Sequence, residues 1–204
     1  MIESVHIDER IRVRDAAILL LGPQVIRVRD FDEESVYIFA EEMTAAHQTG
    51  QNIIPIVIDS FGGDAYALLS MIDILKTSKI PIATIVEGKA MSCGATLFTC
   101  GAEGHRYIGP NATLMFHDVS LEGSGGKSEE VKSVSKETDR LNRKVWRIME
   151  KNIGQPSGYL WNMVHARGRT DWYMTGKEAV KHNIANHVRI PNLHTTVTVR
   201  MDLT

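Results

Sequence analysis

The chain has 204 residues, 43% of them hydrophobic, which suits a single domain over residues 1–204 with a substantial core. Its formal net charge is −2 at pH 7 and its Lys and Arg are scattered among acids, so no global basic field points to nucleic acid or an anionic membrane surface. Cys93 and Cys100, without paired Cys and His clusters, argue against a disulfide framework and a structural zinc site, and they indicate reduced thiols in a cytoplasmic compartment.

The first half of the chain alternates between apolar runs and helical patterns. Residues 1–10 lack an uninterrupted apolar stretch, so we do not expect a secretory signal there, and no apolar run is long enough to span a bilayer. The periodicity predicts strands over residues 16–21, 53–60, 80–86, 105–108 and 112–116, and helices over 32–48, 65–76 and 95–100. This alternation predicts a parallel sheet with crossover helices, whose sites usually lie at the carboxyl ends of the strands.

The second half begins with a glycine-rich break over residues 122–127. A long polar helix with an apolar stripe is expected over 128–152, and its length and polarity favour a projecting helix that packs against another subunit. Further on, we interpret residues 172–180 as a turn that caps a helix, with Thr175 as the N-cap and Glu178 completing a capping box. Residues 195–199 alternate like an edge strand.

Ser92 is the first candidate for chemistry, because it lies in the small-residue turn GKAMSCGA at 88–95, between a strand and a helix. A hydroxyl fixed on such a turn could act as a nucleophile, since backbone N–H groups at a helix start can stabilise an oxyanion. The residue two before it is Ala90, so this is not the G-x-S-x-G elbow of the α/β-hydrolases. An ordinary N-capping serine is the commoner explanation of this local pattern.

Three further features are compatible with a site but are equally compatible with plain structure. Gly62 and Gly63 follow a buried strand, where they could bring a backbone N–H close to a ligand or simply form a tight turn. His117 ends another strand and could be a general base or a packed histidine. Asp118 should point away from it, because neighbours on an extended segment face opposite sides, and Asp171 is a more distant carboxylate that could also be a surface turn residue.

Taken in order, four motifs resemble those of the Clp protease proteolytic subunit, a family of serine peptidases. IDSFGG at 58–63 is similar to the family's I-N-S-P-G-G, and AMSCGA at 90–95 to its A-S-M-G-A nucleophile turn. PNATLMFH at 110–117 resembles P-N-S-x-x-M-I-H, and DWYMTGKEA at 171–179 resembles D-R-x-x-S-A-x-E-A. The resemblance covers most of the chain, from about residue 17 to 188.

The resemblance implies a catalytic triad of Ser92, His117 and Asp171, in which the serine attacks the peptide carbonyl, the histidine carries the proton and the aspartate orients the imidazole. It implies an oxyanion hole made by the N–H groups of Gly63 and Cys93. It also implies a substrate groove in which an extended peptide pairs as an added strand. The groove residues are Gly62, Gly123, Ser124, Gly125 and Gly126.

The same resemblance implies a crotonase-like α/β fold, with repeated β-β-α units and a handle helix within the region of about 121–155. It implies a homo-oligomer built as a double heptameric ring, which hydrolyses unfolded proteins or peptides delivered by an ATP-driven unfoldase of the AAA+ type. No cofactor or metal is expected in this chain, because ATP would be used by the partner and no phosphate-binding Walker pattern is present.

The chain departs from the family at several positions. Residues 1–16 form a divergent N-terminal segment, and Phe61 replaces the proline of the glycine turn. The proline that follows the catalytic histidine in the family is missing, because Asp118 and Val119 follow His117. Thr170 replaces an arginine that helps to link rings in relatives. Two other functions stay open at this point. The chain could be a non-catalytic or regulatory ring subunit, or a crotonase relative that handles acyl-CoA, although such enzymes usually lack a serine triad.

Overall fold

The computed structural model describes residues 22–120, 127–168 and 171–194. The elements are, in chain order, β1 (Ile26–Val28), α2 (Glu33–Gln48), β2 (Ile54–Ser60), α3 (Ala65–Thr77), β3 (Ile82–Met91), α4 (Cys93–Phe98), β4 (Arg106–Ile108), β5 (Thr113–Phe116), α5 (Ser128–Asn152), α6 (Tyr159–His165), β6 (Trp172–Thr175), α7 (Gly176–Lys181) and β7 (His187–Val188). The strands expected at 16–21 and 195–199, the segment 1–16 and Thr170 lie outside the described residues.

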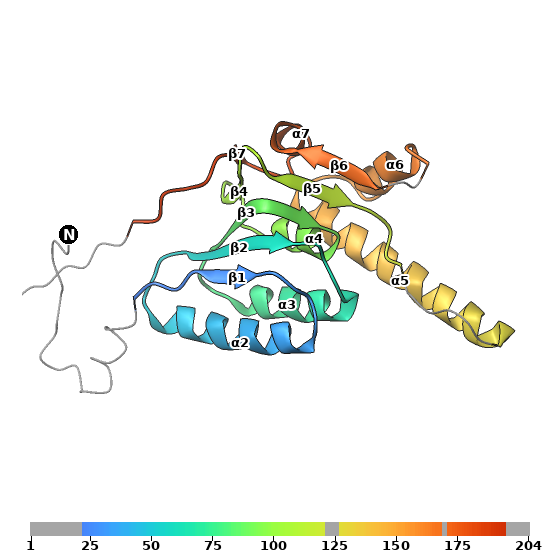
Figure 1. Ribbon diagram of the computed structural model, residues 1–204, viewed down its shortest axis with the longest axis horizontal. Helices are drawn as coiled ribbons and strands as arrows, with labels where there is room; N and C mark the ends of the chain where they lie inside the picture. Colours follow the sequence, from blue (N-terminus) through green and yellow to red (C-terminus); the bar gives the residue numbers. More distant parts are fainter. Residues whose placement is uncertain (1–21, 121–126, 169–170, 195–204) are drawn as a thin grey trace, which may run out of the picture.

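The strands form one sheet in the order β1-β2-β3-β4-β7, and each neighbouring pair along this path is parallel. Strand β4 pairs with residues 84–86 of β3, and β5 pairs in parallel with residues 89–91 of the same strand. Strand β6 pairs with β5 in the antiparallel direction. Helices α2 and α3 lie side by side against the β1–β2–β3 part of the sheet (Figure 1). The predicted α/β class, with a parallel sheet and crossover helices, is therefore confirmed.

The central strand β2 shows why the chain folds this way. Its apolar run includes Ile54, Ile56 and Ile58, which share one face of the strand and have no exposed surface, and Pro55 and Val57 between them are also buried. The chain then leaves the sheet through the turn 61–64, and Asp64 begins α3 by accepting hydrogen bonds from the N–H groups of the helix's first turn. The turn is thus fixed between a buried strand and a capped helix.

Two predictions made from the sequence are wrong in this region. Residues 87–91 were expected to form part of a turn, but β3 runs through to Met91, because Gly88 at φ +72° absorbs a shift in register and the strand then pairs with β5. Residues 172–175 form strand β6 where a turn was expected, although the capping box of Thr175 and Glu178 at the start of α7 is confirmed. Periodicity missed both because these segments are only partly buried.

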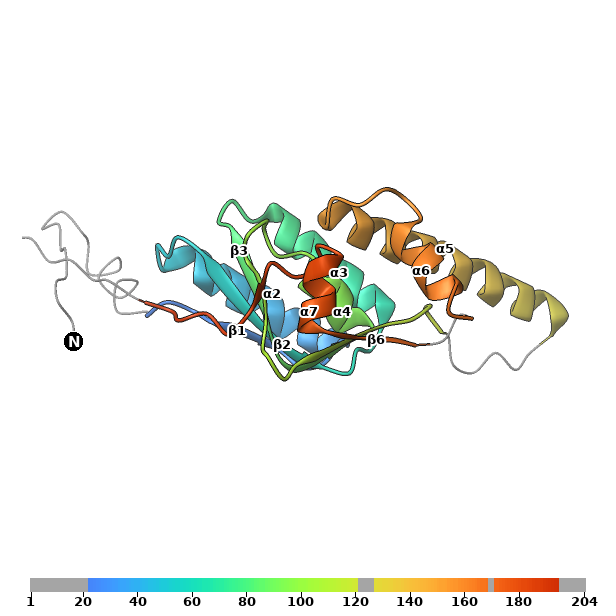
Figure 2. The ribbon, with the colours of Figure 1, turned by 90° about the horizontal axis from the view of Figure 1, so that it is seen from above.

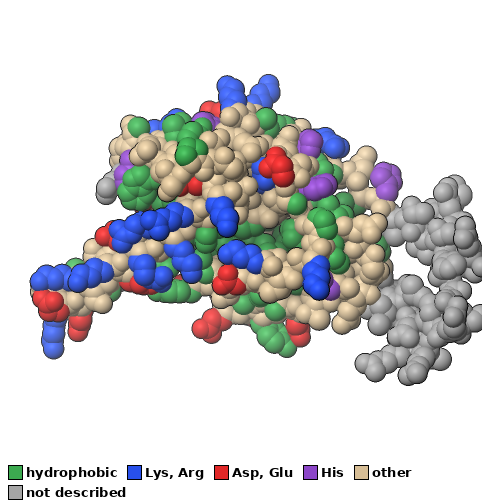
Figure 3. All heavy atoms as spheres, turned by 180° about the vertical axis from the view of Figure 1, so that it is seen from behind, with side chains coloured by type: hydrophobic (Ala, Val, Ile, Leu, Met, Phe, Trp, Pro, Cys, Tyr) green, Lys and Arg blue, Asp and Glu red, His purple; other side chains and the backbone are tan. Residues whose placement is uncertain are grey.

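Helix α5 occupies the predicted span, and its amino-terminal half extends beyond the sheet and the other helices (Figures 1 and 2). Its buried side chains lie in the carboxyl-terminal half and include Leu141, Val145 and Met149, whereas Val131 is exposed. Lys and Arg side chains line the outward face of this helix in Figure 3. The exposed basic residues are Lys132, Lys136, Arg140, Arg143, Lys144, Arg147 and Lys151.

The carboxyl-terminal end of α5 is joined to α6 through one buried carboxylate. Glu150 is 2% exposed and accepts hydrogen bonds from the N–H groups of Gly158, Leu160 and Trp161, at 2.8, 2.9 and 3.3 Å. These N–H groups belong to the start of α6 and would otherwise lack acceptors.

Within the described residues, no helix is both long and apolar enough to cross a membrane.

Candidate functional site

The turns after three parallel strands meet at one edge of the sheet, and they carry the residues singled out in the sequence. In the β3–β5 ladder Met91 pairs with Met115, and the Ser92 N–H donates to the Met115 carbonyl at 2.9 Å. In the β5–β6 ladder Phe116 pairs with Trp172. Ser92 and His117 therefore lie one residue past paired strand ends, and Asp171 lies one residue before the strand that pairs beside His117.

The backbone at Ser92 differs from that of an ordinary helix start. Ser92 occupies the N-cap position of α4 at φ 52° and ψ −116°, a region that residues other than glycine rarely adopt, and its side chain makes no capping hydrogen bond. The interpretation of Ser92 as an N-capping serine is therefore wrong. Strain of this kind costs about 1–3 kcal/mol and is concentrated at functional sites, where the surrounding structure maintains it.

His117 faces Asp171 across the strand ends. The Nδ1 atom of His117 lies 3.8 Å from Oδ1 of Asp171, and the two side chains are 27% and 50% exposed. This separation is longer than a hydrogen bond, so the two side chains are neighbours without a direct hydrogen bond. The structure thus brings together the histidine and the distant carboxylate that sequence order suggested.

Asp118 points away from His117, as the alternation of an extended segment predicts. Its Oδ1 accepts a hydrogen bond from Trp146 Nε1 at 3.1 Å, and its Oδ2 lies 3.4 Å from Nε2 of His165 without forming a well-aligned hydrogen bond. Asp118 therefore connects the segment after His117 to α5 and α6. It is not the partner of the His117 imidazole.

The glycine turn after β2 packs directly against the turn that carries Ser92. A Cβ atom on Gly62 would lie 2.8 Å from the Cβ of Ser92 and 3.3 Å from the N atom of Cys93, so only glycine fits. Gly63 has φ +154° and forms an isolated parallel bridge with Phe31. Among the described residues, the N–H groups of Gly63 and Cys93 have no acceptor, so both are available to a ligand beside Ser92.

A small pocket adjoins Ser92 and His117 and is mainly apolar. Its other lining residues are Ala65, Leu68, Cys93, Thr96, Phe116, Val119, Val145 and Met149. They come from α3, α4, the end of β5 and α5, and most of them are buried. This lining favours an apolar group over a charged group beside Ser92.

Sequence reasoning missed the contribution of α5 to this site. The Val119 N–H donates to Oδ1 of Asn142 at 2.6 Å, and Asn142 is only 7% exposed. Asn142 lies on the same helix face as Val145 and Met149, which line the pocket. A polar residue within an otherwise apolar stripe was the available signal, because a buried amide needs a partner outside its own helix.

Of the predicted groove residues, Gly123, Ser124, Gly125 and Gly126 lie outside the described residues. No cluster of three or more His, Cys, Asp or Glu side chains suited to a metal ion occurs within the described part of the chain.

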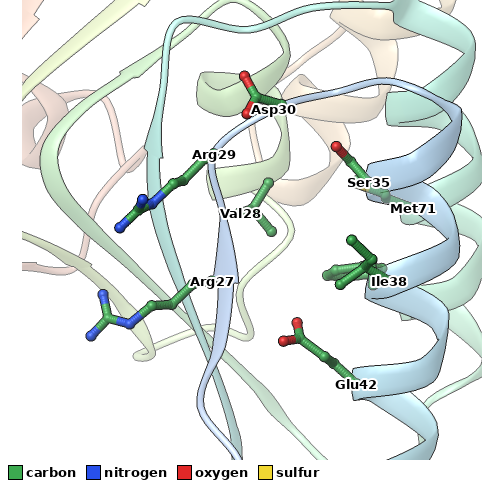
Figure 4. A pocket seen from close by; sticks show the side chains of 9 residues that line it. Arg27, Val28, Arg29, Asp30, Ser35, Ile38, Glu42 and Met71 are labelled. Atoms are coloured by element: carbon green, nitrogen blue, oxygen red, sulfur yellow. The ribbon is translucent and has the colours of Figure 1, made fainter.

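A second pocket lies between β1 and α2 (Figure 4) and shares no residue with the Ser92 pocket. The side chains of Arg27 and Arg29 at this pocket are turned away from α2.

A comparison with known protein families gives an independent assignment. The family model for Clp protease matches residues 8–191, which is most of the chain. The matched span contains every described strand and helix, including the turns that carry Ser92, His117 and Asp171. The fold class and the family resemblance inferred from the four sequence motifs are therefore confirmed, and the chain belongs to the Clp protease family of peptidases.

Proposed function

We propose that this chain is a serine endopeptidase subunit that hydrolyses peptide bonds with Ser92 as its nucleophile. The single observation that carries the proposal is the register of β3, β5 and β6, which sets Ser92, His117 and Asp171 side by side at one edge of the sheet. The strained backbone of Ser92 and its uncapped hydroxyl support the same role. A packed serine without chemistry would gain nothing from such a conformation.

In the proposed reaction His117 accepts the proton of the Ser92 hydroxyl as the oxygen attacks the scissile carbonyl. The imidazolium that forms is stabilised by the carboxylate of Asp171, and His117 then gives the proton to the leaving amine. A water molecule repeats the sequence on the acyl-enzyme and releases the second product. Every group in this mechanism is supplied by the protein, so we propose no metal or organic cofactor for this chain.

The oxyanion of each tetrahedral intermediate would be held by the N–H groups of Gly63 and Cys93. The Cys93 N–H directly follows Ser92, and Gly62, which precedes Gly63, packs against the Cβ of Ser92 and the N atom of Cys93, which supports this assignment. Removing one donor from an oxyanion hole typically lowers kcat by about 10²–10³-fold. This pair of donors would therefore supply a large part of the rate enhancement.

The apolar pocket beside Ser92 supports a preference for an apolar residue on the amino side of the cleaved bond. Leu68, Phe116 and Met149 would contact that side chain, and the described residues that line the pocket include no Asp, Glu, Lys or Arg. Fluorogenic peptides that differ only in this residue provide the test. Peptides with leucine or phenylalanine before the cleaved bond should be hydrolysed at least about tenfold faster than peptides with aspartate or lysine there. Equal rates would show that this pocket does not bind the substrate side chain.

The proposal extends to assembly. The amino-terminal half of α5 stands clear of the rest of the chain and leaves Val131 40% exposed, which supports packing against α5 of another copy. We propose a homo-oligomer built as a double heptameric ring, fed with unfolded proteins by an AAA+ unfoldase that uses ATP. Native mass spectrometry should detect rings of seven or fourteen copies, and a monomer at micromolar concentration would contradict this part of the proposal.

Activity itself is tested by the hydrolysis of an unfolded protein and of an apolar fluorogenic peptide. The wild-type protein should cleave the peptide, and Ser92→Ala should reduce cleavage to the background rate without changing the assembly. The alternative of a non-catalytic ring subunit predicts rings that form but cleave neither substrate, with or without an unfoldase.

A further inference from the structure

The turn that supplies the Gly63 N–H is held by hydrogen bonds from the N–H groups of the residues on either side of Gly63. The Gly62 N–H donates to Ser60 Oγ at 3.0 Å, and the Asp64 N–H donates to the Phe31 carbonyl at 2.8 Å. The first bond fixes the Phe61–Gly62 peptide group, and the second holds the N–H side of the Gly63–Asp64 peptide group. A third contact holds the carbonyl side of that second peptide group.

That third contact comes from the side chain of Cys93. Its Sγ donates to the Gly63 carbonyl at 3.2 Å and lies 3.7 Å from the carbonyl of Asp64. Cys93 is only 5% exposed, and burial raises the pKa of its thiol to about 11, so the sulfur keeps its proton near neutral pH and stays a donor. A thiol in this state is a poor nucleophile, which leaves positioning as its role.

The two oxyanion donors belong to segments that are far apart in the sequence. The Gly63 N–H lies on the turn between β2 and α3, and the Cys93 N–H lies in the first turn of α4. Gly63 has no side chain to limit rotation about its own φ of +154°. The bond from the Cys93 thiol to the Gly63 carbonyl therefore joins the two segments at the point where their N–H groups must converge.

We propose that the Cys93 side chain is a positioning residue, which sets the spacing of the two oxyanion-hole N–H groups by holding the Gly63 carbonyl. The inference rests on the proposed function, since it assigns a role within the oxyanion hole. The oxyanion exists only in the transition state and the tetrahedral intermediate. The thiol should therefore affect kcat, and it should leave KM for a peptide substrate nearly unchanged.

Three substitutions separate hydrogen bonding from packing. Cys93→Ala removes the donor and some volume, Cys93→Val removes the donor and fills the space with a somewhat larger apolar side chain, and Cys93→Ser keeps a donor in a smaller side chain. Cys100→Ala is the matched control, because it removes the other thiol, which bonds to the Thr96 carbonyl and does not line the pocket. Each variant is assayed for kcat and KM on the apolar fluorogenic peptide, for affinity toward a peptide boronate that mimics the tetrahedral adduct, and for Tm.

We expect kcat to fall about five- to tenfold in Cys93→Ala and Cys93→Val, the size of effect that follows from losing one neutral hydrogen bond. The boronate affinity should fall by the same factor, KM should change by less than about twofold, and Cys93→Ser should recover most of the loss. Cys100→Ala should match the wild type. If Cys93→Val fails to fold, the contrast between the alanine and serine variants still decides.

Full activity in both Cys93→Ala and Cys93→Val would overturn the positioning role. So would a pattern that follows side-chain volume, with Cys93→Val active and Cys93→Ser impaired. A wild-type protein that neither cleaves peptides nor binds the boronate would instead overturn the proposed function, and this inference with it. The two failures are thus distinguishable in one set of measurements.

Discussion

The glycine turn packs against the turn that carries Ser92 at Gly62, so Gly62→Ala perturbs the candidate site directly. Gly62 has φ +106°, and a Cβ added there would lie 2.8 Å from the Cβ of Ser92 and 3.0 Å from the carbonyl oxygen of Met91. Both distances are shorter than normal contacts. The Met91 oxygen is backbone and cannot rotate away, so the two turns must separate.

The cost has two parts. An alanine at this φ is strained by about 1–3 kcal/mol, and overpacking of two fixed turns adds about 1–3 kcal/mol. The free energy of unfolding should therefore fall by about 2–6 kcal/mol. Because an error of about 1 Å in a reacting group can cost about 100-fold in rate, kcat/KM should fall by about that factor even in the fraction that is folded.

The matched control is Gly104→Ala. Gly104 also has a positive φ of +80°, but an added Cβ would meet no atom within 4 Å. This variant carries backbone strain without the clash, so it should lose stability while it retains wild-type kcat/KM. Chemical denaturation and peptide hydrolysis measure the two quantities separately. A Gly62→Ala protein that hydrolyses peptides at the wild-type rate would refute the placement of Gly62 against Ser92.

Three further predictions concern Asp171, Asn142 and His182. Asp171→Asn should lower kcat by about 10³-fold or more, with little change in Tm, because His117 loses the charge that stabilises its imidazolium; a loss under tenfold would remove Asp171 from the triad. Asn142→Ala should lower the free energy of unfolding by about 1–3 kcal/mol, since the Val119 N–H loses its acceptor, and unchanged urea denaturation would contradict this. Burial lowers the pKa of His182 below 6.5, so the folded state binds fewer protons than the unfolded state, and stability should decline as pH falls below about 6.5. His182→Gln should flatten that decline in Tm measured from pH 7 to pH 5, and an unchanged slope would show that other groups cause it.

Strong periodicity was sufficient for most of the fold. The apolar run of β2 and the long amphipathic α5 were predicted within about two residues, because burial on both faces and burial on one helix face each leave a clear pattern. Strands β1 and β7 and helix α6 were missed. Each is short, and α6 begins where a distant carboxylate, Glu150, accepts its first N–H groups, which no local pattern reveals.

The sequence motifs named the residues of the candidate site, but they did not predict how those residues are arranged. The order of the motifs singled out Ser92, His117 and Asp171, yet only the strand register shows that they meet. The positive φ of Ser92 had no sequence signal, since serine is not a residue that adopts it readily. The walls contributed by α5 were also unpredictable, because the packing of that helix against α4 depends on tertiary contacts.

The nucleophilic role of Ser92 is the central claim, and covalent labelling tests it most directly. A fluorophosphonate probe should modify the assembled wild-type protein at one position, and peptide mapping by mass spectrometry should place the adduct on Ser92. Ser92→Ala should take up no label, and His117→Ala should react far more slowly than the wild type. An adduct on another residue, or labelling that persists in Ser92→Ala, would contradict the account.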